Sequence, residues 1–221
     1  MQVSLSWNLA TREVTEMELD AIVDRMRNNQ KLFDRTNEYR WMLATGQKDD
    51  IKKFKRQHFP AFAPNALLYE GKARDNVVGL TDMCFLDIDH VDDMMLLDYA
   101  LAILRQDKHV VLACKSVSGN GIHILIRYKE KGRKYPPNRT QMKPLSMRKW
   151  YKKVFDCLVK EYQWKLGLEI DKQPNNIECM CLIASDSNAY YNPDAEPIVL
   201  TVGQEKAAIF VSDDIRQSAM I

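Results

Sequence analysis

The chain has 221 residues, of which 46% are hydrophobic and 28% are charged, with only eight glycines and eight prolines. These proportions are those of a globular protein with one sizeable core, and they exclude the collagen-like, disordered and disulfide-stapled classes. The 32 basic and 30 acidic residues leave a net charge of +2. The average charge therefore does not indicate a nucleic-acid binder, and any such function must be argued from where the charges lie.

No targeting or membrane segment is visible in the sequence. The first twenty residues mix polar and charged side chains, and no apolar run approaches the roughly 18 residues that a membrane span needs. The five cysteines are scattered without a C-x-x-C spacing, which favours reduced thiols over a disulfide framework or a four-ligand zinc site. We therefore expect a cytoplasmic protein that has no membrane partner.

The first 64 residues predict a mostly helical unit that packs on the domain behind it. A short strand precedes charge-rich helical stretches near residues 15–28 and 32–58. The segment FPAFAP then ends the unit, because Pro60 and Pro64 cannot continue a helix.

Hydrophobic periodicity changes from residue 80 onward and divides the rest of the chain into a domain over residues 65–200 and a peripheral C-terminal tail over 201–221. Strands are predicted from apolar runs and alternation, and helices from apolar residues at three- and four-residue spacing. Asp92 or Asp93 is placed to cap the first helix of this domain. The expected elements are a strand (81–89), a helix (92–105), a strand (109–114), a Gly-rich turn (116–121), a strand (122–128), a helix (146–162) and a strand (179–184).

This order, β-α-β-β-α-β, predicts an α+β fold of the ferredoxin or RRM type, called a palm in polymerases. Its antiparallel sheet has two helices on one face and leaves the other face open. The expected spatial order of the strands is 4-1-3-2, so the end of the first strand meets the starts of the third and the fourth.

Two carboxylates end the first strand of this domain. Asp87 and Asp89 share one face of the strand, because side chains alternate, and lie about 6.6 Å apart along it. That separation allows both to ligate one divalent cation, or one of them to bridge two cations roughly 3.5–4 Å apart.

Two further groups are expected to join the pair. His123, at the start of the third strand, falls on the same open face. Asp171, before the fourth strand, is the natural third carboxylate, with Glu169 and Asp186 as the alternatives. Packed carboxylates repel one another unless a cation is present, so the sequence predicts a nucleotide or metal site.

The segments CFLDIDH and SVSGNGIHILI carry a resemblance to a known family. They resemble the D-x-D and Ser-Gly-turn-His motifs of the archaeo-eukaryotic primase/polymerase superfamily. They are most similar to the primase-like N-terminal domains of bacterial phage, plasmid and other mobile-element proteins. The stretch that leads into CFLDIDH is also similar to those domains, so the resemblance covers roughly residues 58–192.

The resemblance implies metal-dependent nucleotidyl transfer with nucleoside triphosphates on a single-stranded nucleic-acid template. It implies that Asp87, Asp89 and Asp171 hold two Mg²⁺ or Mn²⁺ ions. Any accompanying helicase would be a separate chain, because no G-x-x-x-x-G-K-[ST] motif occurs. The expected nucleotide-binding residues are Ser118, Gly119, Gly121 and His123, with Lys115 and Lys172 as point charges for the triphosphate.

One departure from the family pattern opens an alternative. Family members commonly follow the third acid with an arginine that grips the triphosphate, whereas here Cys179 stands near that position. The alternative is a catalytically degenerate nucleic-acid-binding or replication-accessory domain of a mobile element. A third reading is an unrelated ferredoxin-like binding domain whose acids are incidental.

A basic cluster lies between residues 127 and 153, with Glu130 as its one acid. Such a cluster in a near-neutral protein predicts a track for phosphates. The other interpretation is a solvated loop and the outer face of a helix. The residues expected to bind nucleic acid are Arg127, Arg133, Lys134, Arg148, Lys149, Lys152 and Lys153.

Overall fold

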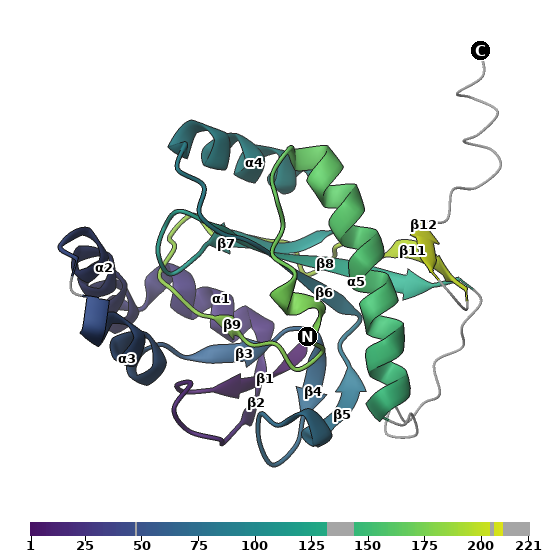
Figure 1. The fold of residues 1–221 in the computed structure, drawn as a ribbon, viewed down its shortest axis with the longest axis horizontal. Helices are drawn as coiled ribbons and strands as arrows, with labels where there is room; N and C mark the ends of the chain where they lie inside the picture. The colour runs from purple at the N-terminus through teal and green to yellow at the C-terminus, as the bar shows by residue number, and fades with distance from the viewer. Residues whose placement is uncertain (47, 132–143, 204–205, 210–221) are drawn as a thin grey trace.

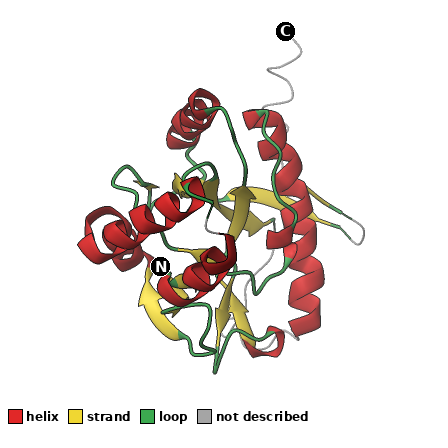
Figure 2. Ribbon diagram, turned by 60° about the vertical axis from the view of Figure 1, so that its left-hand side comes forward, coloured by secondary structure: helices red, strands yellow, loops and turns green. Residues whose placement is uncertain are grey.

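In the computed structural model, a central sheet lies between two groups of helices (Figures 1 and 2). The structure describes residues 1–46, 48–131, 144–203 and 206–209. Helices α4 and α5 lie on one side of the sheet, and α1, α2 and α3 on the other (Figure 1). The protein is therefore α+β, as the sequence predicts.

The central sheet is built on strands β6 (Met83–Ile88), β7 (Val110–Lys115) and β8 (Ile122–Glu130). Strand β8 pairs antiparallel with β6 on one side and with β7 on the other. This confirms the predicted 1-3-2 part of the strand order. The sheet is extended by β10 (Tyr190–Tyr191), which pairs with β7, and by β11 (Ile198–Val202), which pairs with β8 in parallel. Strand β12 (Ala207–Ile209) forms a hairpin with β11.

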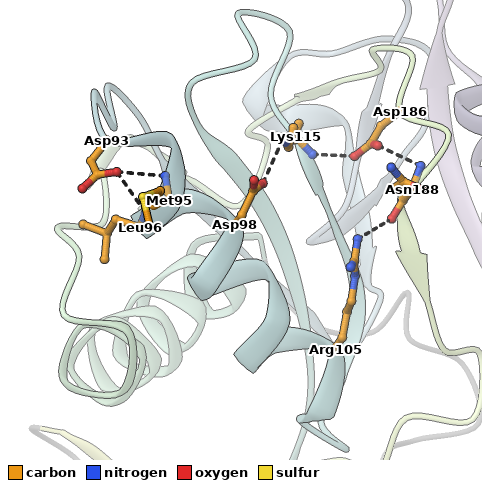
Figure 3. Close-up of polar contacts among 8 residues, drawn as sticks. All are labelled: Asp93, Met95, Leu96, Asp98, Arg105, Lys115, Asp186 and Asn188. Carbon is orange, nitrogen blue, oxygen red and sulfur yellow. Dashed lines mark hydrogen bonds and ion pairs between the residues drawn. The ribbon is translucent and has the colours of Figure 1, made fainter.

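Helices α4 (Met94–Gln106) and α5 (Pro144–Leu166) cover one face of this sheet. Residues Cys84, Leu86 and Ile88 of β6 point into the core beneath them, as alternation predicts. Asp93 caps α4, accepting from the backbone N–H groups of Met95 and Leu96 (Figure 3).

The N-terminal segment combines three helices with short strands. Its helices are α1 (Leu19–Asn28), α2 (Gln30–Ala44) and α3 (Lys48–His58). It also contains β1 (Gln2–Ser6), β2 (Thr15–Glu18) and β3 (Ala61–Ala63). Later in the chain, β4 (Ala66–Leu68) and β5 (Val77–Leu80) form a separate antiparallel pair. Short 3₁₀ turns span Arg74–Asn76 and Gln173–Asn175.

The expected fourth strand does not lie beside β6, which corrects the predicted 4-1-3-2 order. Strand β9 (Cys181–Leu182) pairs with β3 instead and completes a second sheet in the order β2-β1-β3-β9. Hydrophobic alternation predicts a strand but not the strand it pairs with, and here β9 pairs with the free edge of β3.

The second face of the central sheet is not open either. Met83, Phe85 and Leu125 point to this face and are buried against the N-terminal sheet and helices. Large apolar side chains on both faces of a sheet require a layer on each side. Among the helices that the structure describes, none is long and apolar enough to cross a membrane.

Candidate metal and nucleotide site

Three carboxylates meet where β6 ends. Asp87 is the penultimate residue of β6, and Asp89 follows the strand directly. Asp171 is brought to them by the loop after α5, and its backbone N–H donates to the carbonyl oxygen of Asp87 at 2.8 Å. One carboxylate oxygen of each residue lies within 4.8 Å of the other two. The structure thus brings together the three acids that the sequence singled out.

The spacing of these oxygens fits a divalent cation. Mg²⁺ binds oxygen at about 2.0–2.1 Å, so two ligands on opposite sides of one ion are roughly 4.2 Å apart. The observed limit of 4.8 Å exceeds this by a fraction of an ångström, which small side-chain rotations can close. The three acids could therefore hold a metal ion.

Asp87 is the least satisfied carboxylate of the three. Its side chain is only 18% exposed, and its Oδ1 atom is buried without a hydrogen bond. Burial, followed by the charges of Asp89 and Asp171, raises its pKa to about 7 against the opposing charge of Lys55. A bound cation would remove this conflict, because it supplies the positive charge that the carboxylates lack.

His123 lies directly across the ladder from Asp87, as predicted. It is 7% exposed, however, so it does not stand on an open face. Its Nε2 atom is 3.6 Å from Asp87 Oδ1, and its Nδ1 atom is 3.4 Å from the Cys181 sulfur. Burial and, to a smaller extent, the charge of Lys55 lower its pKa to about 4. His123 is therefore a neutral, buried imidazole in contact with Asp87. Its expected contact with a triphosphate stays a prediction.

The Gly-rich turn lies against the end of β6. An added Cβ at Gly121 would meet the carbonyl oxygen of Ile88 at 2.3 Å, so only glycine permits this approach. Gly119 adopts a φ of +86°, which also favours glycine. The Ser118 hydroxyl donates to the Asn120 side chain. The turn is thus built to sit beside the acids, although nothing in it contacts them through a charged group.

The two lysines expected near the triphosphate lie in different surroundings. Lys115 Nζ is 3.0 Å from Asp98 Oδ1 on α4, and its backbone N–H donates to Asp186 (Figure 3). Lys172 is exposed and lines a cavity of about 800 Å³ beside the acidic cluster. This acidic cavity, as we call it below, is also lined by Asp89, Asp92, Asp93, Glu169 and Asp171.

The alternatives for the third acid are separated by the structure. Asp186 accepts from the backbone N–H groups of Lys115 and Asn188, so it is a turn residue. Glu169 lines the acidic cavity but is not one of the three acids whose ligand atoms converge.

The N-terminal unit contributes residues that sequence reasoning missed. The charge of Lys55 on α3 acts on both Asp87 and His123. The charge of Asp89 raises the pKa of Tyr39, after the larger effect of burial. The Arg40 guanidinium donates to the carbonyl oxygens of Ser116 and Val117 at 3.3 and 3.1 Å. No local pattern marks these residues, because only the packing of α2 and α3 on the sheet brings them to the site.

The predicted basic track lies mostly at the other end of the sheet. Lys149 is 17 residues before the end of α5, roughly 25 Å along the helix axis from the loop that carries Asp171. Arg127 is near the far end of β8 and donates to the carbonyl oxygen of Ala195. Arg133 and Lys134 lie outside the described residues.

Most of the described basic side chains in this track already have partners within the chain. Arg148 donates to the carbonyl oxygen of Arg74. Lys152 pairs with Asp156 at 2.9 Å, and Lys153 donates to the carbonyl oxygen of Gly203 at 2.7 Å. Binding of nucleic acid by this surface stays a prediction, and the structure separates it from the acidic cluster.

The comparison with known families gives one match. The model of the BT4734-like N-terminal domain family matches residues 53–191 of the chain. The match includes the three acids, the Gly-rich turn, His123 and Lys55. No curated protein and no solved structure matches the chain.

Proposed function

The chain belongs to the BT4734-like N-terminal domain family, and we propose that this member is a metal-dependent nucleotidyltransferase of the primase/polymerase kind. It would act on single-stranded nucleic acid with nucleoside triphosphates. The observation that carries the proposal is the convergence of Asp87, Asp89 and Asp171, with a buried Asp87 oxygen that has no hydrogen bond. Like-charged carboxylates held together in this way fit a cation-dependent reaction better than a structural role.

The donor set suits a hard divalent cation. All three ligands are carboxylates, which Mg²⁺ and Mn²⁺ prefer. Mg²⁺ or Mn²⁺ bound there, as one ion or as a pair, would lower the pKa of an attacking hydroxyl and neutralise the charge on a leaving pyrophosphate.

The protein residues have distinct roles in this proposal. Asp87 and Asp89 hold the metal from β6, and Asp171 closes the site from the loop after α5. His123 packs beside Asp87 on the neighbouring strand, with its Nε2 atom 3.6 Å from Asp87 Oδ1. Lys55 adds a positive charge on the side of the N-terminal unit, where a triphosphate would need one.

Nucleotide incorporation tests the proposal. The wild type should extend or initiate a strand from labelled ATP or dATP with Mn²⁺ and a single-stranded template, and reactions with and without a primer separate polymerase from primase. Asp87→Asn with Asp89→Asn should reduce the rate by about 10²- to 10⁴-fold, because bound metal supplies several kcal/mol of transition-state stabilisation. Equal incorporation by wild type and variant would refute the proposal.

One observation favours a second candidate, a catalytically degenerate binding or replication-accessory domain. Cys179 is close enough to the acidic cluster that Asp87 and Asp171 add to the burial that raises its pKa to about 12. A thiol therefore stands where related enzymes are expected to carry an arginine, and a neutral thiol does not bind a triphosphate. Strand binding without incorporation in the wild type would select this candidate.

A further inference from the structure

A second cavity, of about 240 Å³, lies beside the Gly-rich turn, and we call it the α2 cavity. Its walls come from the α1–α2 junction, one face of α2, the end of β7 and the loop over residues 185–187. Arg40 lines it and also donates to the carbonyl oxygens of Ser116 and Val117 in the turn. The other end of the turn, at Gly121, adjoins Ile88 and Asp89. The turn thus separates the α2 cavity from the acidic cluster.

The two cavities carry opposite charge. The acidic cavity is lined by five acids, with Lys172 and His90 as its basic side chains. The α2 cavity is lined by Arg27, Arg40 and Lys115, with Asp186 as its one acid. Asp186 accepts from two backbone N–H groups (Figure 3), which stabilise its charge. The α2 cavity therefore favours an anion, whereas the acidic cavity favours a cation.

The positive charges of both arginines of the α2 cavity are not neutralised by a carboxylate of the described residues in an ion pair, so they can act on a bound anion. Arg27 donates to the carbonyl oxygen of Ala189, and Arg40 to two carbonyl oxygens of the turn. Within the described part of the chain, neither makes an ion pair with a carboxylate. Each guanidinium has five N–H donors in a planar fork that suits phosphate.

The cavity also has an exposed aromatic wall. Phe33 is 49% exposed and lines the cavity from α2. Asn37, one helical turn further on, lies on the same side and lines the cavity beside it. An exposed ring next to an amide and two guanidinium groups is the combination that single-stranded nucleic-acid sites use, with the ring as a stacking surface for a base.

The wall opposite α2 is held in place. Lys115 Nζ pairs with Asp98 of α4, and Arg105 of α4 donates to the carbonyl oxygen of Asn188 at 3.1 Å (Figure 3). The backbone N–H of Ser185 donates to Thr36 of α2 at 3.0 Å, so the loop over residues 185–187 is held on both sides and the cavity is preformed.

We infer that the α2 cavity binds one unpaired nucleotide of a single-stranded nucleic acid, with its base on Phe33 and its phosphates toward Arg27 and Arg40. The volume is below the roughly 300–1,000 Å³ of drug-sized sites, so the cavity would take the base of one nucleotide while the rest of the strand stays outside it. Strand β7 is two strands from β6, roughly 10 Å across the sheet. The inference rests on the proposed function, since it gives the template strand a path past the Gly-rich turn to the acidic cluster.

Fluorescence anisotropy with a labelled 20-nucleotide strand, in DNA and in RNA form, tests this inference without metal or activity. Phe33→Ala should weaken binding roughly 5- to 100-fold, the range that a lost base–aromatic stack gives. Phe33→Trp should retain binding, because the stacking surface is kept. Arg27→Gln should reduce the slope of log Kd against log salt by about 0.7, the contribution of one phosphate contact in a single strand.

Matched controls separate this inference from the proposed function. Trp164 on α5 is 83% exposed and lines no cavity described here, so Trp164→Ala should bind as the wild type does. Asp87→Asn should also bind normally while losing incorporation. Unchanged binding by Phe33→Ala, or equal affinity for duplex and single strand, would overturn the α2 cavity as a strand site and leave the acidic cluster untouched. Absence of binding by the wild type would overturn it as well, and incorporation would then decide the proposed function separately.

Discussion

Two carboxylates in this protein, the buried Asp107 and the half-buried Asp87, have opposite surroundings. Asp107, at the end of α4, accepts from the Lys165 ammonium at 2.6 Å, from the Tyr162 hydroxyl at 2.8 Å and from the His109 N–H at 2.9 Å. Burial opposes its ionisation, yet these contacts lower its pKa below the ordinary value. Asp87 is half-buried beside two other acids, and its pKa rises to about 7.

The difference fits a structural role for Asp107 and the metal-binding role proposed for Asp87. Asp107 has the partners that a buried charge needs for stability, whereas Asp87 lacks them in the protein alone. An unsatisfied carboxylate lowers the stability of the folded chain, and the proposed bound cation would offset that loss by supplying the missing charge. The predictions below test this contrast.

The largest expected effect belongs to Asp107→Asn. This change leaves Lys165 without its partner and should lower the free energy of unfolding by about 3 kcal/mol, the lower end for a broken buried pair because Lys165 can turn toward solvent. Urea denaturation measures it. A loss below 1 kcal/mol would show that Asp107 is not the structural anchor described here.

Asp87→Asn should raise the free energy of unfolding of the metal-free protein at neutral pH, whereas Asp107→Asn lowers it. A carboxylate whose pKa is raised to about 7 binds a proton in the folded state that the unfolded state releases near pH 4. The wild type should therefore lose about 2 kcal/mol relative to the variant as the pH rises from 5 to 7. The comparison must be with the variant, because the lowered pKa of His123 gives the reverse slope between pH 4 and 6.5 in both proteins.

Urea denaturation of both proteins at pH 5, 6, 7 and 8 with EDTA measures this difference. A difference that does not change with pH would contradict the unsatisfied state of Asp87. Addition of Mn²⁺ at pH 8 should stabilise the wild type and leave the variant nearly unchanged.

His123→Ala should cost about 1–2 kcal/mol of stability. The ring packs edge-on against Phe85 with centroids 5.5 Å apart and contacts the Cys181 sulfur, so its loss leaves a cavity. Thermal unfolding measures the change. A melting temperature equal to that of the wild type would mean that His123 is free to contact a ligand directly.

The smallest expected effect is at the far end of α5. Replacing Lys149, Lys152 and Lys153 by Ala should weaken strand binding less than Phe33→Ala does, because two of them have partners within the chain and all lie far from the acidic cluster. Anisotropy at several salt concentrations measures it. A larger loss than that of Phe33→Ala, with a flatter salt dependence, would move the strand path to α5.

Local sequence pattern predicted one half of the molecule better than the other. The succession β6, α4, β7, β8 and α5 follows from hydrophobic period and turn residues. The expected strand order, together with alternation, places Asp87 beside His123. The partner of β9 and the layer over the second sheet face were not predictable, because strand pairing across more than a hundred residues leaves no local signal. Lys55, Tyr39 and Arg40 were missed for the same reason.

Mn²⁺ binding tests the central claim most directly. Titration of the metal-free wild type, followed by the electron paramagnetic resonance signal of free Mn²⁺, should show one or two bound ions per chain. Asp87→Asn with Asp89→Asn should abolish that binding, whereas Asp107→Asn, studied where it remains folded, should preserve it. Absence of binding at millimolar Mn²⁺, or equal binding by wild type and double variant, would contradict the assignment of Asp87, Asp89 and Asp171 as a metal site.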